Sequence, residues 1–216
     1  MVDTPSDPAS QLLRMTDTVT SEELAWMVLE HAQLPAEFSS FELLREERLD
    51  NETMARHTGG RYTIASLGEL GRSSGYARAF AVPQGAPTLR EEPADILEAA
   101  TVVHLFEQPK DVDRWIDDVF VAGFKDRVGG EEPDGSRLLG VESLKVSGFH
   151  EHAAALLVVH EAPEGSVLAS TIVDFRLGRL LGVAYVVAKR DASFIELATE
   201  LGAELERQMV RIVLGS

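Results

Sequence analysis

The stretch of sequence that decides the fold is Thr171-Ile-Val-Asp-Phe-Arg-Leu-Gly-Arg-Leu-Leu-Gly-Val-Ala-Tyr-Val-Val187. It contains two runs of β-branched and aromatic residues, separated by a turn signal that includes the glycine at position 178. This pattern predicts a β-hairpin whose strands occupy residues 167–177 and 180–188. Strands joined by so short a turn must pair antiparallel.

Two more strand-like runs precede the hairpin, at residues 138–146 and 153–160, and turn signals with glycine separate the runs. After the hairpin, apolar residues recur at helical spacing over residues 194–212. Either Asp191 or Ser193 is the expected N-cap of this final helix. Its length of about 30 Å is sufficient to cross a whole sheet.

The first half of the chain mixes helical and strand-like patterns. Residues 96–106 are apolar on both faces, which predicts a central strand that is covered on two sides. Residues 109–125 form the clearest helix, with a proline in its first turn and one apolar stripe. The other expected elements are a helix from Thr20 to Pro35, a helix or helix pair at 51–71, and strands at 38–44 and 75–82.

Strands and helices do not alternate strictly in this order, which disfavours a doubly wound parallel sheet. We therefore predict an α+β fold: a mainly antiparallel sheet packed by long helices, including a C-terminal helix. Residues 1–18 are polar and contain proline, and we expect them to form a flexible N-terminal tail. Residues 19–216 are expected to form a single α+β domain, because a chain of this length buries roughly 70% of its surface in one core.

Composition excludes several classes of function. The chain has 20 basic and 36 acidic residues, a net charge of −16, which repels nucleic-acid phosphates and anionic lipid headgroups. It has no cysteine, which excludes thiolate catalysis and disulfides. No run approaches the roughly 20 apolar residues of a membrane span, and no nucleotide motif is present, so neither a span nor a cofactor is expected.

The four strand-like runs from residue 138 to residue 188, closed by the helix that starts near Asp191, resemble the PsbP-like α+β fold of small bacterial lipoproteins. The hairpin quoted above carries this resemblance. It implies an exported, non-catalytic lipoprotein domain, and it transfers no catalytic residue. Because no signal peptide is recognised, the chain as given is expected in the cytoplasm, or outside it if a leader has been removed.

Histidine suggests the one candidate metal site. His150 and His152 have the spacing at which two side chains of a strand point the same way, and two imidazoles can bind zinc if a third ligand joins them. His160 or Glu161 is the candidate third ligand. A metal-assisted hydrolase is therefore one functional hypothesis, and a solvated strand end is the structural alternative.

Other candidate residues point to binding. Trp115, Phe120, Tyr185 and Phe194 are candidates to line an apolar cleft between the sheet and the long helices, unless they simply fill the core. His104 lies on a buried strand, either as a neutral general base or as a core residue. Two more segments have a polar alternative. Arg176, beside Asp174, either anchors an anion or pairs at the surface, and Thr58-Gly-Gly-Arg61 forms a turn or cradles an anion.

Three functional hypotheses follow. The first is a non-catalytic binding or interaction module for a small apolar ligand or a protein partner. The second is the metal-assisted hydrolase that uses His150 and His152. The third is an assembly protein that associates through an exposed sheet edge at residues 75–82. The absence of a nucleophile–base set favours a protein that is not an enzyme, and the oligomeric state is not determined.

Overall fold

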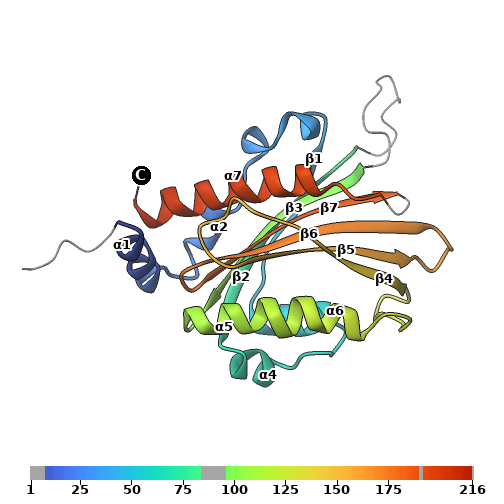
Figure 1. The fold of residues 1–216 in the computed structure, drawn as a ribbon, viewed down its shortest axis with the longest axis horizontal. Helices are drawn as coiled ribbons and strands as arrows, with labels where there is room; N and C mark the ends of the chain where they lie inside the picture. The colour runs from blue at the N-terminus through green and yellow to red at the C-terminus, as the bar shows by residue number, and fades with distance from the viewer. Residues whose placement is uncertain (1–7, 84–95, 190–191, 216) are drawn as a thin grey trace, which may run out of the picture.

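The computed structural model describes residues 8–83, 96–189 and 192–215, and its centre is one seven-stranded sheet (Figure 1). Every neighbouring pair of strands is antiparallel, in the order β1-β2-β3-β7-β6-β5-β4. The strands are β1 Glu42–Arg48, β2 Arg72–Ala81, β3 Ile96–Phe106, β4 Arg137–Leu144, β5 Ala153–Glu161, β6 Val167–Leu177 and β7 Leu180–Lys189. The predicted α+β fold is confirmed.

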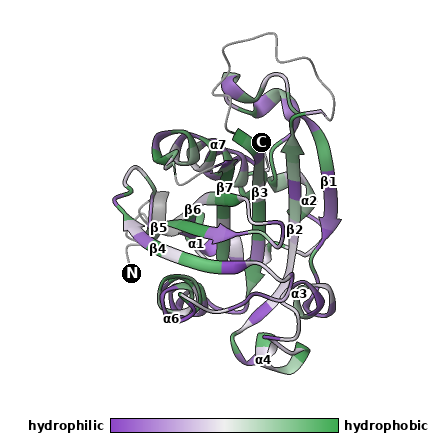
Figure 2. Ribbon diagram, turned by 90° about the vertical axis from the view of Figure 1, so that its right-hand side faces the viewer, coloured by the Kyte–Doolittle hydropathy of each residue, from purple (hydrophilic) through white to green (hydrophobic). Residues whose placement is uncertain are grey.

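Helices cover both faces of the sheet (Figures 1 and 2). The upper face, which presents Val103, Val173 and Ala184, is covered by α7 Ile195–Val213. The lower face, which presents His104, Asp174 and Val183, is covered by a rod and by two short helices. The rod consists of α5 Pro109–Arg114, the π-helix η4 Trp115–Ala122 and α6 Gly123–Asp126, and the short helices are α3 Asn51–His57 and α4 Ile64–Glu69.

The hairpin quoted at the start forms as predicted. Strands β6 and β7 pair from Leu177 opposite Leu180 to Leu168 opposite Lys189, so the turn between them has two residues. The first of these, Gly178, has a φ of 57°, a left-handed conformation that glycine adopts without a steric penalty. The C-terminal helix also forms as predicted. None of the helices in the described part of the chain is long and apolar enough to span a bilayer.

The structure of residues 8–18 differs from the predicted flexible N-terminal tail. They form α1 Pro8–Met15 and the 3₁₀ turn η1 Thr16–Thr18, and Thr16 is fully buried. Arg179, in the turn between β6 and β7, donates hydrogen bonds to the carbonyls of Thr16, Asp17 and Val19. This buried contact attaches the segment to the sheet. Local composition does not predict it. Residues 1–7 of the predicted tail lie outside the described residues.

The cap of the C-terminal helix also differs from the prediction. Phe194, rather than Ser193, occupies the N-cap position, and Asp191 lies outside the described residues. No side chain caps this helix within its own segment. The N–H of Phe194 instead donates to the hydroxyl of Thr171 on β6, at 3.0 Å. A side chain of the sheet therefore satisfies a backbone group at the start of the helix.

The segment between Thr20 and Pro35 is less helical than predicted. Glu23 accepts a hydrogen bond from the N–H of Thr20 at 2.7 Å, the expected contact of a capping box. The helix nevertheless lasts one turn, α2 Leu24–Met27, because the backbone is extended from Val28. The 3₁₀ turns η2 His31–Gln33 and η3 Ala36–Phe38 follow, so the strand predicted at 38–44 begins later, at the first residue of β1.

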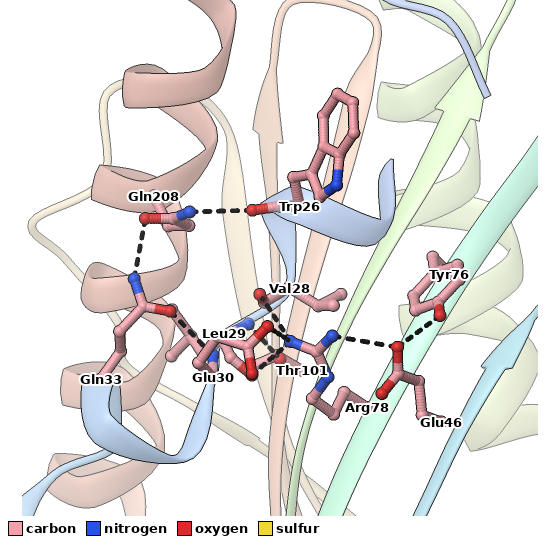
Figure 3. Close-up of polar contacts among 10 residues, drawn as sticks. All are labelled: Trp26, Val28, Leu29, Glu30, Gln33, Glu46, Tyr76, Arg78, Thr101 and Gln208. Carbon is pink, nitrogen blue, oxygen red and sulfur yellow. Dashed lines mark hydrogen bonds and ion pairs between the residues drawn. The ribbon is translucent and has the colours of Figure 1, made fainter. Parts of the chain in front are cut away.

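The guanidinium of Arg78 on β2 explains the extended backbone (Figure 3). Its side chain is 7% exposed, and it donates to the carbonyl of Leu29 at 3.2 Å and pairs with Glu30 and Glu46 at 2.8 and 3.0 Å. Tyr76 donates to the same oxygen of Glu46. An extended segment after α2 can bring a backbone carbonyl to this buried cation, whereas a continuous helix would use its carbonyls internally.

Strand β2 lies inside the sheet, hydrogen-bonded to β1 on one side and to β3 on the other. The predicted association through an exposed edge at residues 75–82 is therefore wrong. The error arises because alternation of polar and apolar residues reports which faces of a strand are buried, and it does not report whether its edges are paired. The edge strands are β1 and β4.

Replacement of Arg78 by methionine tests the role of this cation. We expect Arg78→Met to lower the free energy of unfolding by about 3 kcal/mol, because the carbonyl of Leu29 loses its guanidinium donor and the carboxylates of Glu30 and Glu46 lose their cationic partner. Urea unfolding followed by circular dichroism measures the change. The control is Arg207→Met, which removes an exposed pair with Glu204 on α7 and should cost less than about 1 kcal/mol. Equal midpoints for the two variants would refute the structural role.

Candidate ligand-binding cleft

The rod on the lower face packs closely over one part of the sheet. Trp115 lies in a buried cluster with Phe106 and Leu181, and Phe120 lies in a second cluster with Leu156. Trp115 and Phe120 are 6% and 4% exposed. Both were predicted to line a ligand site, but here they fill the core between rod and sheet, which was the structural alternative.

Between the rod and α3 the lower face is hollowed by a cleft with a volume of about 290 Å³. Figure 2 shows the two helical groups below the sheet, with α6 on one side and α3 on the other. The cleft is lined by apolar side chains on its floor and polar ones near its rim. The lining residues are His57, Thr58, Arg61, Phe124, Glu132, Pro133, Asp134, Ser136, Leu138, Val158, His160, Ser170 and Ile172.

Strand alternation places the floor residues together. Val158 on β5 lies directly opposite Ser170 on β6, and His160 and Ile172 are each two residues further along their strands. Residues at that spacing share one face of a sheet, so all four side chains point to the lower side. Phe124 on α6 forms the wall on the side of the rod. The cleft therefore rests on rigid strands.

Charged groups at the rim are engaged with one another. Glu132 pairs with Arg61 and, at 3.4 Å, with Nε of Arg127. Asp134 accepts hydrogen bonds from the hydroxyl and N–H of Ser136, and these bonds hold the pKa of its carboxyl below the usual value. The rim thus carries charged groups that are bonded within the protein, while the floor combines the apolar Val158 and Ile172 with the polar Ser170 and His160.

Two predicted ligand residues lie away from the cleft lining. Phe194 is on the upper face at the start of α7, where it packs against the upper core. Tyr185 is half-buried on the lower face, and its hydroxyl donates to Glu98 at 2.8 Å and accepts from Arg45 at 3.0 Å. Burial, reinforced by the charge of Glu98, raises the pKa of this phenol. The four predicted aromatic residues therefore do not line one cleft.

His104 is a buried core residue with a cationic neighbour. Arg72 donates to its Nδ1 at 3.0 Å, and also to Oδ1 of Asn51 and the carbonyl of Leu49. Because a guanidinium only donates, Nδ1 must carry the lone pair and the proton must reside on Nε2. Burial, and then the charge of Arg72, hold the pKa of His104 well below its ordinary value. A side chain at Gly75 would meet this imidazole at 2.4 Å.

Arg176, the last predicted ligand residue, is part of an ion-pair cluster near the end of β6. It pairs with Asp113 of α5 at 3.1 Å and with Glu151 at 2.7 Å. His152 lies within 3.2 Å of the same Asp113. The guanidinium of Arg176 therefore links the rod to the loop before β5. Its partner is not the neighbouring Asp174, contrary to one of the two alternatives drawn from the sequence.

The histidines predicted to bind a metal are separated. His150 contacts Glu206 of α7 on the upper side, whereas His152 contacts Asp113 and Asp117 on the lower side. The spacing rule fails because β5 begins only at Ala153, after both histidines. His160 lies about 25 Å further along the strand. Within the described ranges, no three potential ligands of a metal ion converge, so the predicted metal site is wrong.

Sequence reasoning missed most of the cleft. His57, Phe124 and Glu132 carried no signal, because they come from three segments that only the fold brings together. The segment Thr58-Gly-Gly-Arg61, for which the sequence predicts a turn or an anion cradle, forms a turn at the rim of the cleft. Gly59 and Gly60 in it have φ values of 61° and 82°. Two adjacent glycines were therefore the one local signal of this part of the site.

Comparison with known proteins identifies a fold but no family. No family model matches the chain, and no curated protein matches it. Among solved structures, the chain is similar to the extracellular domain of PknH from Mycobacterium tuberculosis. The two share 11% sequence identity, with a TM-score of 0.56, and the match covers 92% of this chain and 98% of that one. Likeness at this identity shows a shared fold.

Asp174 is a buried acidic side chain of the lower face. It is 3% exposed, and its cross-strand neighbours are Ala154 and Val183. Its carboxyl has no hydrogen-bond or ion-pair partner among the residues that the structure describes. Burial raises the pKa of this carboxyl well above its ordinary value. Burial in the folded protein therefore favours the protonated carboxyl more than the unfolded chain does.

The isosteric change Asp174→Asn tests this assignment. Because the folded pKa is raised, the stability of the wild type falls as pH rises above about 4, by up to about 1.4 kcal/mol per pH unit until the folded pKa is reached. The variant lacks this pH-dependent contribution, so its advantage in free energy of unfolding should grow as the pH rises above about 4. Urea unfolding at a series of pH values measures the difference. A difference that is independent of pH would show that the pKa of Asp174 is not raised in the folded protein.

Proposed function

We propose that this chain is a non-catalytic module that binds a small, mainly apolar molecule in the cleft of the lower face. The cleft itself carries the proposal. Its floor presents the half-buried Ile172 and the buried Val158 between α3 and α6. A concave, apolar site with a few polar groups, mounted on rigid strands, is typical of small-molecule binding.

The polar groups of the cleft suit a ligand that needs orientation. The hydroxyl of Ser170 can both donate and accept, and the imidazole of His160 also belongs to the lining, whereas the hydroxyl of Thr58 already donates to the carbonyl of Ala55. Such groups select among apolar molecules by hydrogen bonding. Glu132 and Asp134 are already engaged with partners of the protein itself, which supports a role in shaping the rim.

We further propose that the module works outside the cytoplasm. The structurally similar domain of PknH is described as extracellular, and the resemblance of the last third of the chain to PsbP-like lipoproteins supports the same location. A binding domain there would report on, or carry, a molecule of its surroundings. The proposed location rests on similarity of fold, whereas the proposed binding rests on the cleft.

Titration with the neutral fluorophore N-phenyl-1-naphthylamine tests the proposed binding. We expect saturable fluorescence enhancement with a Kd on the order of 100 µM or tighter, as for a ligand of this size. Ile172→Glu places a charge on the apolar floor and should weaken binding by about tenfold or more. The matched control is Val167→Glu, an exposed position on the same strand and outside the cleft. Equal binding by both variants would refute the cleft as the site.

A further inference from the structure

Most charged groups that line the cleft are engaged with a group of opposite charge in the protein itself. The guanidinium of Arg61 pairs with Glu132, and the same carboxylate lies 3.4 Å from Nε of Arg127. Nε2 of His57 lies 3.7 Å from a carboxylate oxygen of Glu47 on β1. Within the lining, the charges of Arg61 and Glu132 therefore cancel, and neither is free to select the charge of a ligand.

Asp134 differs from these groups because its partners are neutral. Its carboxylate accepts a hydrogen bond from the N–H of Ser136 at 2.9 Å and a second one from the hydroxyl of the same residue. No lysine or arginine pairs with Asp134 in the part of the chain that the structure describes. Hydrogen bonds favour the ionised carboxyl without removing its charge. The lining therefore keeps one negative charge, at Asp134, that no arginine or lysine neutralises.

The backbone that carries this carboxylate is fixed by a closed turn. The N–H of Glu132 donates to the carbonyl of Ser136 at 2.7 Å, and the N–H of Gly135 donates to the carbonyl of Glu132 at 2.9 Å. Gly135 has a φ of 82°, so the chain reverses there without a steric penalty. Ser136, which holds the carboxylate, is buried. The charged group is therefore positioned before a ligand arrives, which lowers the cost of binding.

The same carboxylate keeps acceptor sites for a ligand. An ionised carboxylate has about four lone-pair sites, and the two hydrogen bonds from Ser136 leave others open. The floor of the cleft offers apolar contact at Val158 and Ile172. A molecule with an apolar body and one ammonium group would satisfy both parts of the cleft. The hydrogen bond from an ammonium to a carboxylate belongs to the stronger, charge-assisted class.

We propose that the ligand of the cleft is a small amine, an apolar body with one ammonium group, and that Asp134 is its counter-ion. This inference rests on the proposed binding function and names the class of ligand. The net charge of −16 attracts cations to the surface and repels anions. An anionic ligand would place a like charge beside Asp134, whereas an uncharged ligand would leave its charge without a counter-ion.

His160 opposes this selection when its imidazole is protonated. It lies on β5 in the lining of the cleft, and a positive charge on its ring acts on the carboxyl of Asp134. The amine and the imidazolium would then compete for one carboxylate. The binding measurements are therefore made at about pH 8, at which an ordinary imidazole is uncharged.

Three naphthalenes with different head groups test the class of ligand. They are 1-naphthylmethylamine, 1-naphthylmethanol and 1-naphthoate, and each is titrated as a competitor of N-phenyl-1-naphthylamine on the full chain, in about 50 mM salt to limit screening. We expect the amine to bind about fivefold more tightly than the alcohol, and the carboxylate about fivefold more weakly. Equal affinities for the amine and the alcohol, or tightest binding of the carboxylate, would overturn the proposed class.

Two variants with the same change of charge locate the counter-ion. Asp134→Asn keeps the size of the side chain and an oxygen that accepts from Ser136, and we expect it to bring the affinities for amine and alcohol to within about twofold of each other. Glu131→Gln is the matched control, because this exposed residue lies outside the cleft lining, and it should keep the preference of the wild type. A full preference for the amine in Asp134→Asn would overturn the role of Asp134.

Removal of the other carboxylate of the lining should have the opposite effect. Glu132→Gln leaves the guanidiniums of Arg61 and Arg127 without their shared carboxylate. We expect the preference for the amine over 1-naphthoate to fall by about fivefold or more, because the rim then carries uncompensated cations. An unchanged preference would show that the charge of the lining does not select the ligand.

Failure of the proposed binding function has a different signature. If neither N-phenyl-1-naphthylamine nor the alcohol binds saturably, or if Ile172→Glu binds them as the wild type does, the cleft is not the binding site and both proposals are overturned. If both molecules bind saturably and Ile172→Glu weakens them, but the amine has no advantage, only the cationic class is overturned.

Discussion

The burial of one arginine within the sheet organises the upper half of the molecule. Arg78 needs acceptors where it lies, and the carbonyl of Leu29 and the carboxylates of Glu30 and Glu46 supply them (Figure 3). The chain after α2 must therefore be extended across the upper face, beside α7. Gln208 of α7 reinforces this arrangement through the carbonyl of Trp26. An unpaired guanidinium at this position would cost several kcal/mol, so the extended segment must cover this part of the upper face.

The helices on the lower face are held together mainly by apolar packing. Near Trp115 the rod and the two short helices share one buried apolar cluster, which contains Leu67 of α4 and has Met54 of α3 packed against it. Towards α6 they meet instead through the partly exposed pair of Arg61 and Glu132 and the contact of Gly59 with Pro133. The cleft lies at this second, more polar end of the contact.

The two faces of the sheet also differ in the partners of their buried polar groups. On the upper face, the terminal nitrogens of Arg78 pair with the carboxylates of Glu30 and Glu46, although its Nε has no partner. On the lower face, Arg72 has only neutral acceptors in hydrogen-bond contact, and burial lowers its pKa to about 10. Asp174, on the same face, is buried, which raises the pKa of its carboxyl well above the usual value. The lower side therefore holds polar groups at a cost in stability, which is common where a protein binds other molecules.

The sequence by itself determined the hairpin, the helix α7 and the antiparallel class of the sheet, because period-two alternation, turn glycines and the amphipathic stripe of α7 are local properties of the chain. It did not determine on which side of the sheet each histidine lies, since His150 and His152 precede β5 and turn to opposite faces. Only the tertiary structure placed β2 inside the sheet and brought Arg61 to Glu132, which are 71 residues apart. Such contacts depend on the order of strands and on the packing of helices upon them, and neither is encoded in local periodicity.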